Sequence, residues 1–420
     1  MNGPHLAVLM HDGFYCAGTG AGYANHASLD VLARNLAPHV NLHVLPVHLA
    51  PASCEYDPAW HRRTLDTLAQ HPLHHVHSLD NGTDAMVRFS GLPAFQTLAI
   101  SSARALSRVL PTADAPALII AFDVPFLGVP ALLPAALAQN MITVPRSSAL
   151  LHAPDDRERI AYERQGLQTA ASRSGRIGAI SAHMRRHLHH DLDVPEESLI
   201  DLPDGLTAAD RRFAQPQDRL LPTGAREHGF ILSMGRAQPY KGWDDLLDAM
   251  GLLKSRTPTV PPLLLAAVTE DPRPSLYQQH LKRRIEQENL PVCLRTRFDH
   301  RIRDLLAHPL LRVVVVPSRA EPFGRIPLEA FTAGMAPVVS TTAGGLAEQV
   351  LDGITGYTAP PGDPRGLAGA VHRALDCTTA DRARLSQAAR QLAHERHDHE
   401  AALLRTLRET APWALREPVC

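Results

Sequence analysis

Residues 311–334 read LRVVVVPSRAEPFGRIPLEAFTAG, and this stretch decides the fold. Its run of four valines predicts a strand that is buried on both faces, which is typical of parallel sheets covered by helices. A glycine-containing turn follows, and a helix is predicted over Pro327–Ala333. A strand, a turn and a helix in this order bring backbone N–H groups to the carboxyl edge of a parallel sheet, where open α/β sheets bind ligands.

The same alternation of short apolar runs and longer amphipathic segments extends over the whole chain. Strands are predicted over Leu6–Met10, Asn41–Val47, Ala117–Phe122, Met141–Val144, Arg176–Ser181, Gly229–Met234, Leu263–Val268, Arg312–Pro317 and Pro337–Ser340. Helices are predicted over Ala24–Leu36, Ala131–Asn140, Trp243–Leu253 and Ser275–Glu288, with another that begins at Ala182. This alternation predicts an α/β protein with two doubly wound parallel sheets, each covered by helices on both faces.

The boundary between the two series lies in a stretch rich in proline, glycine and charge. We therefore predict one domain over residues 1–205, a linker over 206–225 and a second domain over 226–400. The last segment, 401–420, is predicted to be mostly helical.

Composition excludes several classes of protein. The net charge of -1 argues against a nucleic-acid partner, and no apolar run approaches the roughly 20 residues that span a bilayer. The five cysteines (Cys16, Cys54, Cys293, Cys377 and Cys420) are scattered without a CxxC pair, so neither a disulfide framework nor a metal site is expected. No signal peptide is recognisable at the N-terminus, and we expect a cytoplasmic protein.

Two glutamates in the opening stretch are candidate ligand-binding residues. Glu321 falls in the loop after the valine strand, and Glu329 falls on the first turns of the following helix. Both carboxylates can accept hydrogen bonds from sugar or ribose hydroxyl groups. The alternative is that Glu321 caps the helix and Glu329 is solvated.

A second loop, in the run ILSMGRAQPYKG (231–242), offers two cations. Arg236 presents a planar fork and Lys241 a compact charge, and together they can stabilise a departing diphosphate. The alternative is a solvated loop with two ordinary cations. The hypothesis requires this loop and the loop after the valine strand to converge on one diphosphate pocket.

The second half resembles the retaining glycosyltransferases of family 4, also called glycosyl transferases group 1, which have the GT-B fold. Their two glutamates separated by seven residues match Glu321 and Glu329, and their GR…KG element matches Gly235, Arg236, Lys241 and Gly242. The segment GMAPVVSTTAGGLAEQVLDGITGYTAPPGD (334–363) is similar to the family's usual continuation. The resemblance implies two Rossmann-like domains that face a central cleft.

The resemblance also implies roles for residues of the second half. Glu329 would hold the ribose hydroxyls of a nucleotide sugar, and Glu321 would contact the transferred sugar. Backbone N–H groups of Phe323, Gly324, Arg325 and Ile326 would meet the sugar or the diphosphate. Arg236 and Lys241, beside Gly235, would neutralise the leaving diphosphate without a metal ion.

The first half matches the family more loosely. The loop CAGTGAGYANHA (16–27), with Gly18, Gly20 and Gly22, resembles the family's glycine-rich loop, and its glycines permit close backbone approach. His152 falls where the family often carries a histidine near the transferred sugar, although a surface histidine fits this position nearly as well. By the same resemblance, the helix over 401–420 would cross back onto the first domain.

The function predicted from these residues is retaining transfer of a hexose or pentose. The donor would be a nucleotide-diphosphate sugar, most commonly a UDP-sugar in the family, and no cofactor is expected. The acceptor would be a hydroxyl of a small polar molecule, and the arginine-rich composition suggests secondary-metabolite assembly of the aminoglycoside type. The alternatives are a nucleotide-sugar epimerase or hydrolase of GT-B architecture and a non-catalytic nucleotide-sugar-binding protein; the oligomeric state stays open.

Overall fold

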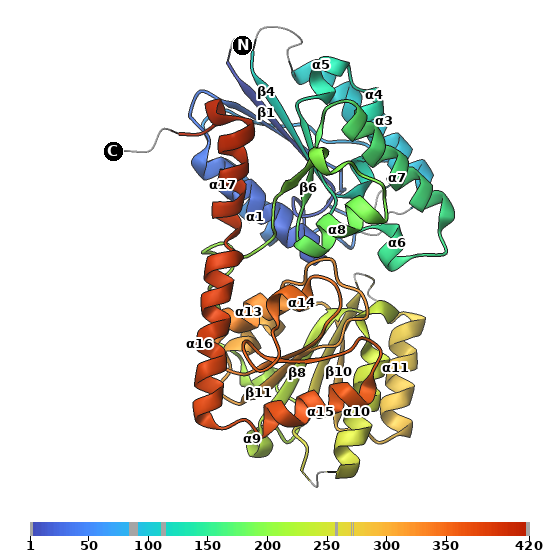
Figure 1. Ribbon diagram of the computed structural model, residues 1–420, viewed down its shortest axis with the longest axis vertical. Helices are drawn as coiled ribbons and strands as arrows, with labels where there is room; N and C mark the ends of the chain where they lie inside the picture. Colours follow the sequence, from blue (N-terminus) through green and yellow to red (C-terminus); the bar gives the residue numbers. More distant parts are fainter. Residues whose placement is uncertain are drawn as a thin grey trace. The chain divides into compact units, whose positions relative to one another are not determined.

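The computed structural model describes residues 3–83, 91–110, 115–256, 259–269, 271 and 273–416, so Cys420 lies outside the described residues. The chain forms two compact units (Figure 1). Unit 1 comprises Met1–Asp204 together with His399–Cys420, and unit 2 comprises Gly205–Asp398. Residues 206–225, which we expected to form a linker, therefore group with unit 2.

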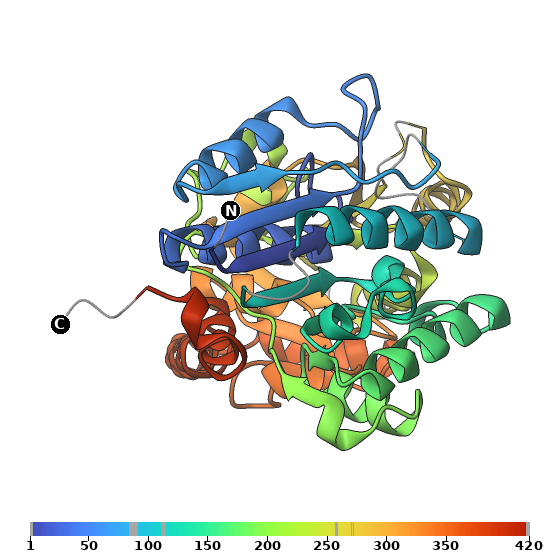
Figure 2. The ribbon, with the colours of Figure 1, turned by 90° about the horizontal axis from the view of Figure 1, so that it is seen from above.

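Unit 1 is built on a seven-stranded sheet whose pairings are all parallel. Its order is β3-β2-β1-β4-β5-β6-β7, and Figure 2 shows the strands around β1 side by side. The strands are β1 (His5–Met10), β2 (Asn41–Pro46), β3 (His74–Val76), β4 (Ala117–Phe122), β5 (Met141–Val144), β6 (Arg176–Ala179) and β7 (Leu199–Asp201). The strand order reverses between β1 and β4, which makes the carboxyl ends of these two strands the switch point of the sheet.

Helices join these strands. The longer ones are α1 (Gly20–Asn35), α2 (Pro58–Leu68), α3 (Leu92–Val109), α7 (Arg157–Ser172), α8 (Ala182–His190) and α17 (His399–Thr410). α1 begins earlier than predicted because the Thr19 side chain accepts a hydrogen bond from the Gly22 N–H and caps the helix. The single helix predicted over Ala131–Asn140 is wrong: α4 (Val129–Leu132) and α5 (Ala135–Ala138) are separated at Pro134, which has no N–H to continue the helix.

Unit 2 repeats this architecture with a six-stranded sheet. Its order is β10-β9-β8-β11-β12-β13, again with parallel pairing throughout. The strands are β8 (Phe230–Arg236), β9 (Leu263–Thr269), β10 (Val292–Arg297), β11 (Leu311–Val316), β12 (Val338–Thr341) and β13 (Tyr357–Ala359). The order reverses between β8 and β11, so the loops after these strands lie at the switch point of this sheet.

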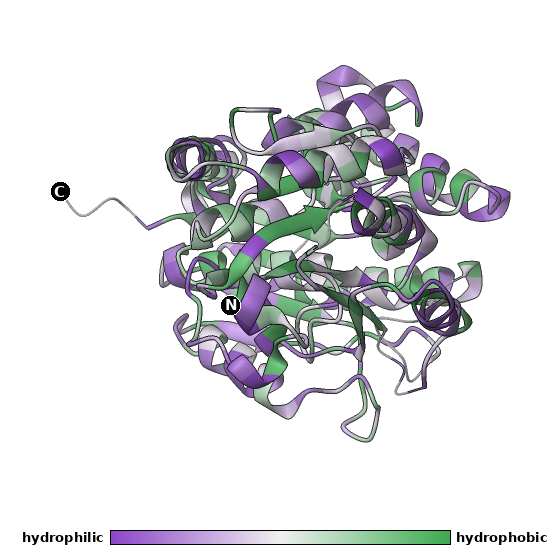
Figure 3. Ribbon diagram, turned by 90° about the horizontal axis from the view of Figure 1, so that it is seen from below, coloured by the Kyte–Doolittle hydropathy of each residue, from purple (hydrophilic) through white to green (hydrophobic). Residues whose placement is uncertain are grey.

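The core of unit 2 lies between its sheet and its helices. These helices are α10 (Trp243–Arg256), α11 (Leu276–Gln287), α13 (Ile326–Ala333), α14 (Leu346–Gln349), α15 (Pro364–Leu375) and α16 (Thr379–Arg396). The side chains of Trp243, Val313 and Val315 are buried together in this core. Figure 3 shows the resulting pattern, with hydrophobic residues on the strands and hydrophilic residues on the outer sides of the helices. In the part of the chain that the structure describes, none of the helices combines the length and the apolar character that a bilayer crossing requires.

Candidate active site

The loops after β8 and β11 converge at the switch point of unit 2, as the sequence predicted. The backbone N–H of Arg319 donates to the carbonyl of Tyr240 at 2.7 Å. Gly242 has a φ of +71°, and a Cβ atom there would lie 2.0 Å from the carbonyl oxygen of Pro317. Glycine is therefore required at position 242, because any side chain would push the two loops apart.

A lysine and a glutamate link the two loops directly. Lys241, at the end of the 3₁₀ turn Pro239–Lys241, donates from Nζ to Oε2 of Glu321 at 2.5 Å. The hydroxyl of Ser318 donates to the same carboxylate oxygen at 3.2 Å. The Lys241 and Glu321 side chains are only 15% and 13% exposed. Glu321 is therefore held by a cation and a hydroxyl, and the alternative in which it caps α13 is wrong because the cap residue is Arg325.

Arg236 and Lys241 both contact Tyr240, which lies between them in the sequence. Nη2 of Arg236 donates to the Tyr240 hydroxyl at 2.7 Å, and Nζ of Lys241 lies 5.6 Å from the centre of the Tyr240 ring. The indole N–H of Trp243 donates to the Arg236 carbonyl at 2.9 Å, which fixes the end of β8 against α10. Gly235, before Arg236, packs its backbone against the same indole ring. The two predicted cations are thus arranged around one short loop.

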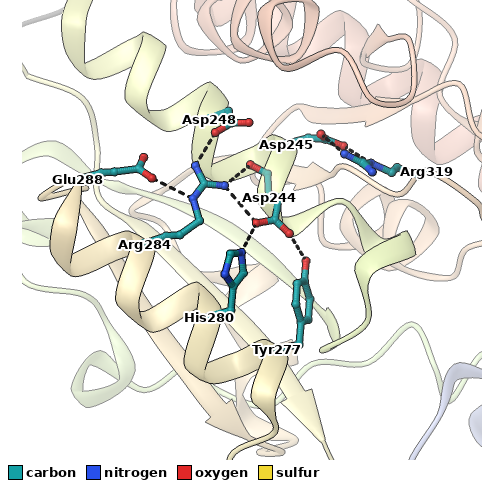
Figure 4. Close-up of polar contacts among 8 residues, drawn as sticks. All are labelled: Asp244, Asp245, Asp248, Tyr277, His280, Arg284, Glu288 and Arg319. Carbon is teal, nitrogen blue, oxygen red and sulfur yellow. Dashed lines mark hydrogen bonds and ion pairs between the residues drawn. The ribbon is translucent and has the colours of Figure 1, made fainter.

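An ion pair joins the β11 loop to the first turn of α10 (Figure 4). Nε and Nη2 of Arg319 donate to the two oxygens of Asp245 at 2.7 and 2.6 Å. Figure 4 also shows that the neighbouring Asp244 accepts hydrogen bonds from Tyr277, at 2.8 Å, and from Arg284 of α11. The start of α10 is therefore held by the β11 loop on one side and by α11 on the other. Lys241, two residues before α10, is positioned by the same contacts.

The turn Pro322–Gly324 packs against the segment that precedes α14. The Gln349 side chain donates to the carbonyl of Phe323 at 2.9 Å, and the Phe323 side chain is buried. α13 then begins at Ile326 without a side-chain hydrogen bond from its cap residue. N–H groups of a first helical turn have no acceptor within the helix, so this terminus can bind an anion.

Glu329 lies on the first turn of α13 between two arginines. Its carboxylate is 3.3 Å from Nε of Arg303, on α12 (Arg301–Asp304), and 3.7 Å from Nη2 of Arg325. Because Glu329 is only 7% exposed, the alternative of a solvated helix residue is wrong. Arg325 also lies 3.0 Å from Oδ1 of Asp210 and donates to the carbonyl of Gly205 at 3.0 Å.

Asp210 gives this network a measurable pH dependence. Burial raises the pKa of its carboxyl, but Arg325, the two Thr207 hydrogen bonds and Arg303 outweigh burial and hold the pKa below its ordinary value of 3.8. A carboxyl group whose pKa is lower in the folded state stabilises the folded state at pH values above its ordinary pKa. This stabilisation is lost as the pH falls through the lowered pKa. Between about pH 5 and pH 3, we expect the unfolding free energy of the wild type to fall more steeply than that of Asp210→Asn.

Chemical denaturation over this pH range measures the difference between the two slopes. Asp193→Asn is the matched control, because the Asp193 side chain is 61% exposed and pairs with Arg164 at 3.7 Å. If the unfolding free energies of wild type and Asp210→Asn fall equally steeply with pH, the lowered pKa of Asp210 is contradicted.

The glycine-rich loop of unit 1 is packed against a carboxylate. The Thr19 hydroxyl donates to Asp12 at 2.7 Å, and a Cβ atom on Gly22 would lie 2.4 Å from the same carboxyl group. Gly22 therefore serves the packing of α1 on Asp12, while Gly20 is the first residue of the helix and Gly18 precedes it. The Asp12 carboxylate therefore lies beside the N-terminus of α1, and ligand binding by this loop stays a prediction.

His152 and Arg146 have different surroundings in unit 1. His152 is the last residue of α6 (Ala149–His152) and is partly buried, so it belongs to a different unit from Glu321 and Lys241. Arg146 is buried, forms an ion pair with Asp204 and donates to the Asn25 side chain at 2.7 Å. Arg146 is thus part of the internal structure of unit 1.

Several residues of the site were missed in the sequence. They are Asp210, Tyr240, Asp245, Arg303, Ser318 and Arg319. Ser318 and Arg319 could have been found, because they lie in the deciding stretch between the strand and Glu321. Asp210 and Arg303 carry no local signal, since only the folded chain brings them to Arg325 and Glu329. Within the described ranges, no group of three histidine, cysteine, aspartate or glutamate residues is arranged to hold a metal ion.

Residues 223–392 match the protein-family model described as Glycosyl transferases group 1. The match includes both switch-point loops of unit 2. The chain thus carries a Glycosyl transferases group 1 domain, as the sequence predicted for its second half.

Curated relatives share part of the chain. A glycogen synthase of Mycobacterium tuberculosis H37Rv is 35% identical over 192 residues, which are 45% of this chain and 42% of that protein. A D-inositol 3-phosphate glycosyltransferase of Jonesia denitrificans is 32% identical over 265 residues, 59% of each chain. The chain spans about half the length of the curated relatives it matches.

Solved structures resemble the whole chain. A sucrose-phosphate synthase from Thermosynechococcus elongatus aligns with a TM-score of 0.73 at 19% identity, covering 97% of this chain and 98% of that one. Anabaena HepE in complex with UDP-glucose aligns with a TM-score of 0.65 at 18% identity, covering 97% and 99%. These likenesses confirm the predicted GT-B fold with its two parallel-sheet α/β domains.

Proposed function

We propose that this chain is a glycosyltransferase that moves a sugar from a nucleotide-diphosphate donor to a hydroxyl of a small polar acceptor. The observation that carries the proposal is the contact between Lys241 and Glu321, which joins the two switch-point loops inside the Glycosyl transferases group 1 domain. Membership of family 4, retention of anomeric configuration and a role in secondary metabolism belong to the same proposal. A cytoplasmic location also belongs to this proposal.

The donor would lie along the carboxyl edge of unit 2. Glu329 accepts hydrogen bonds from the ribose hydroxyls, and its two arginines keep the carboxylate oriented. The diphosphate lies at the start of α13, where first-turn N–H groups and the helix dipole favour negative charge. Arg236 and Lys241 approach the same group from the β8 loop, and UDP is the first nucleotide to test because HepE was solved with it.

Transfer would follow a same-face route. The bond between the sugar and the diphosphate breaks, the acceptor hydroxyl bonds to the sugar carbon on the same face, and the leaving phosphate takes the hydroxyl proton. Arg236 and Lys241 stabilise the negative charge that grows on the diphosphate in this step. Glu321 contacts the transferred sugar and keeps Lys241 beside it.

A screen of UDP-, GDP-, ADP- and dTDP-sugars by thermal shift tests donor binding. A ligand present at about 100 times its Kd stabilises the folded state by about 2.7 kcal/mol, which is easily measured. Incubation with the selected donor then separates the alternatives. Turnover of donor alone indicates a hydrolase or epimerase, whereas binding without transfer to any hydroxyl acceptor indicates a non-catalytic protein. NMR of the product reports the anomeric configuration, and an inverted product would refute the retaining mechanism.

Glu329→Gln is expected to weaken nucleotide binding by about 10-fold or more, since hydrogen bonds to a charged group contribute roughly 1.5–3 kcal/mol. Calorimetry with the selected nucleoside diphosphate measures the loss. The 2′,3′-dideoxy nucleotide provides the sharper test, because wild type and variant should bind it equally. Glu286→Gln, at an exposed pair with Lys282, is the control. A similar loss with both nucleotides would show that Glu329 does not recognise the ribose.

A further inference from the structure

We propose that His11 and Asp123 form an acceptor site in unit 1, at which the imidazole binds a hydroxyl group of a neutral polyol such as a sugar or a cyclitol. The inference rests on the proposed function and names the residues that receive the acceptor.

The two residues meet at the switch point of the first sheet. Met10 and Phe122 are register partners at the ends of β1 and β4, and His11 and Asp123 are the next residues on each strand. Loops at a switch point form the ligand-binding edge of a doubly wound sheet. The pair therefore occupies the place in unit 1 that the β8 and β11 loops occupy in unit 2.

Asp123 has a backbone conformation that is almost restricted to glycine. Its φ is 84° and its ψ is 164°, whereas the other described non-glycine residues with positive φ (Ser174, Asp193 and Asn289) have φ between 48° and 61°. Such strain persists where the surrounding structure imposes it, and it clusters at functional sites. Here the Asp123 N–H donates to the carbonyl of Val144 at 2.9 Å, and the side chain is buried. Glycine would fit this backbone without strain, so the presence of aspartate indicates a use for its carboxylate.

The carboxylate is directed at His11. Oδ2 of Asp123 lies 3.6 Å from Nδ1 of His11, and within the described chain this oxygen accepts no hydrogen bond. The Asp123 side chain is 4% exposed and that of His11 is 14% exposed, so His11 is the member that can reach a ligand. Hydrogen bonds of this kind are often long before substrate binds. In the complex with the acceptor, a small approach of the two side chains would let the carboxylate orient the imidazole.

The charges around the pair select the class of ligand. With Nδ1 protonated toward Asp123, Nε2 of His11 is an acceptor and takes a hydrogen bond from a hydroxyl. Glu163 is paired with Arg159 at 2.8 Å, and Arg146, whose guanidinium lies 5.0 Å from the centre of the Phe122 ring, is paired with Asp204. The carboxylates of Asp12, which is buried next to His11 in the sequence, and of Asp123 therefore leave the region with a net negative charge, which disfavours an anionic group. A neutral hydroxyl is therefore the ligand that the site fits.

Two substitutions of Asp123 separate ligand binding from structure. Asp123→Gly removes the carboxylate and relieves the backbone strain, so we expect an unchanged or higher Tm with an acceptor KM raised at least about 10-fold. Asp123→Asn keeps the side-chain shape without the charge, so we expect the same rise in KM without a gain in Tm. His11→Gln should also raise the acceptor KM, and the nucleotide Kd should not change in any of the three variants. Asp193→Gly is the matched control, because it relieves a positive φ at an exposed aspartate of the same unit.

Kinetics are measured with the donor selected by thermal shift and with glucose, fructose and myo-inositol as acceptors. An acceptor KM in Asp123→Gly equal to that of the wild type would overturn the proposal. A fall in the Tm of this variant together with weaker nucleotide binding would also overturn it, because that result indicates a structural role for Asp123. If the wild type transfers to none of these acceptors, the proposed function fails by itself. Imidazole ¹⁵N NMR then decides on the acceptor site: a shift of the His11 Nε2 signal on addition of these polyols supports it, and no shift overturns it.

Discussion

Lys241→Ala is expected to lower the rate of sugar transfer at saturating donor by about 10²–10³-fold, the effect of removing one group that stabilises transition-state charge. The physical reason is the position of Nζ, which lies 2.5 Å from Glu321 at the point where the two loops of unit 2 meet. The protein should stay folded, because Glu321 keeps its hydrogen bond from Ser318. Single-turnover kinetics measure the step, and circular dichroism checks the fold.

The chain offers a matched control for this substitution. Lys282 pairs with Glu286 at 3.8 Å on the surface, where its side chain is 70% exposed, so Lys282→Ala should transfer sugar at the wild-type rate. Lys241→Arg keeps the charge and should recover part of the activity. A wild-type rate in Lys241→Ala would remove the diphosphate role from this residue.

Arg146→Ala should lower the unfolding free energy by about 3–5 kcal/mol, the typical cost of breaking a buried ion pair. The substitution leaves the Asp204 charge buried without its partner and removes the hydrogen bond to Asn25. Denaturation in urea measures the change. A loss below about 1 kcal/mol, the range of surface pairs, would show that the Asp204 charge finds solvent instead.

A surface arginine of the same unit tests the importance of burial. Arg185 pairs with Glu196 at 2.7 Å, but the Glu196 side chain is 55% exposed. Arg185→Ala should therefore cost no more than about 1 kcal/mol. The double substitution Arg146→Met with Asp204→Leu removes both charges and should recover much of the stability, because a buried pair can often be replaced by apolar residues of similar volume.

Local patterns were sufficient to predict the strands that carry the site. The four valines of β11 and the apolar run of β8 are continuous because both faces of these strands are covered. The glycines after these strands indicated sharp turns, and Gly242 makes one where the loops touch. The convergence of the loops could be predicted, since parallel strands bring their carboxyl ends to one edge.

The partners of the predicted residues could not be read from the sequence in the same way. Glu329 was expected to be available for a ribose, but it lies beside two arginines. Arg303 comes from the connection between β10 and β11, and Arg325 comes from the turn just before α13. The position of Arg303 depends on the packing of α12, a helix of four residues without a periodic pattern. Long-range contacts of this kind depend on how whole elements pack, and the spacing of residues in the sequence does not predict them.

Unit 1 consists of two separate segments of the chain, and this arrangement decides how each unit can be produced alone. α17 lies against α1, where the His399 ring contacts Ser28 at 2.8 Å and Glu400 pairs with Arg34 at 3.0 Å. Unit 2 is therefore an insertion within unit 1, and the N–H of Leu206 donates to the carbonyl of His397 where the chain enters and leaves it. Removal of the C-terminal segment would take a helix away from the first unit. An isolated first unit has to be made by joining residue 204 to residue 399, whereas the second can be excised as one uninterrupted piece.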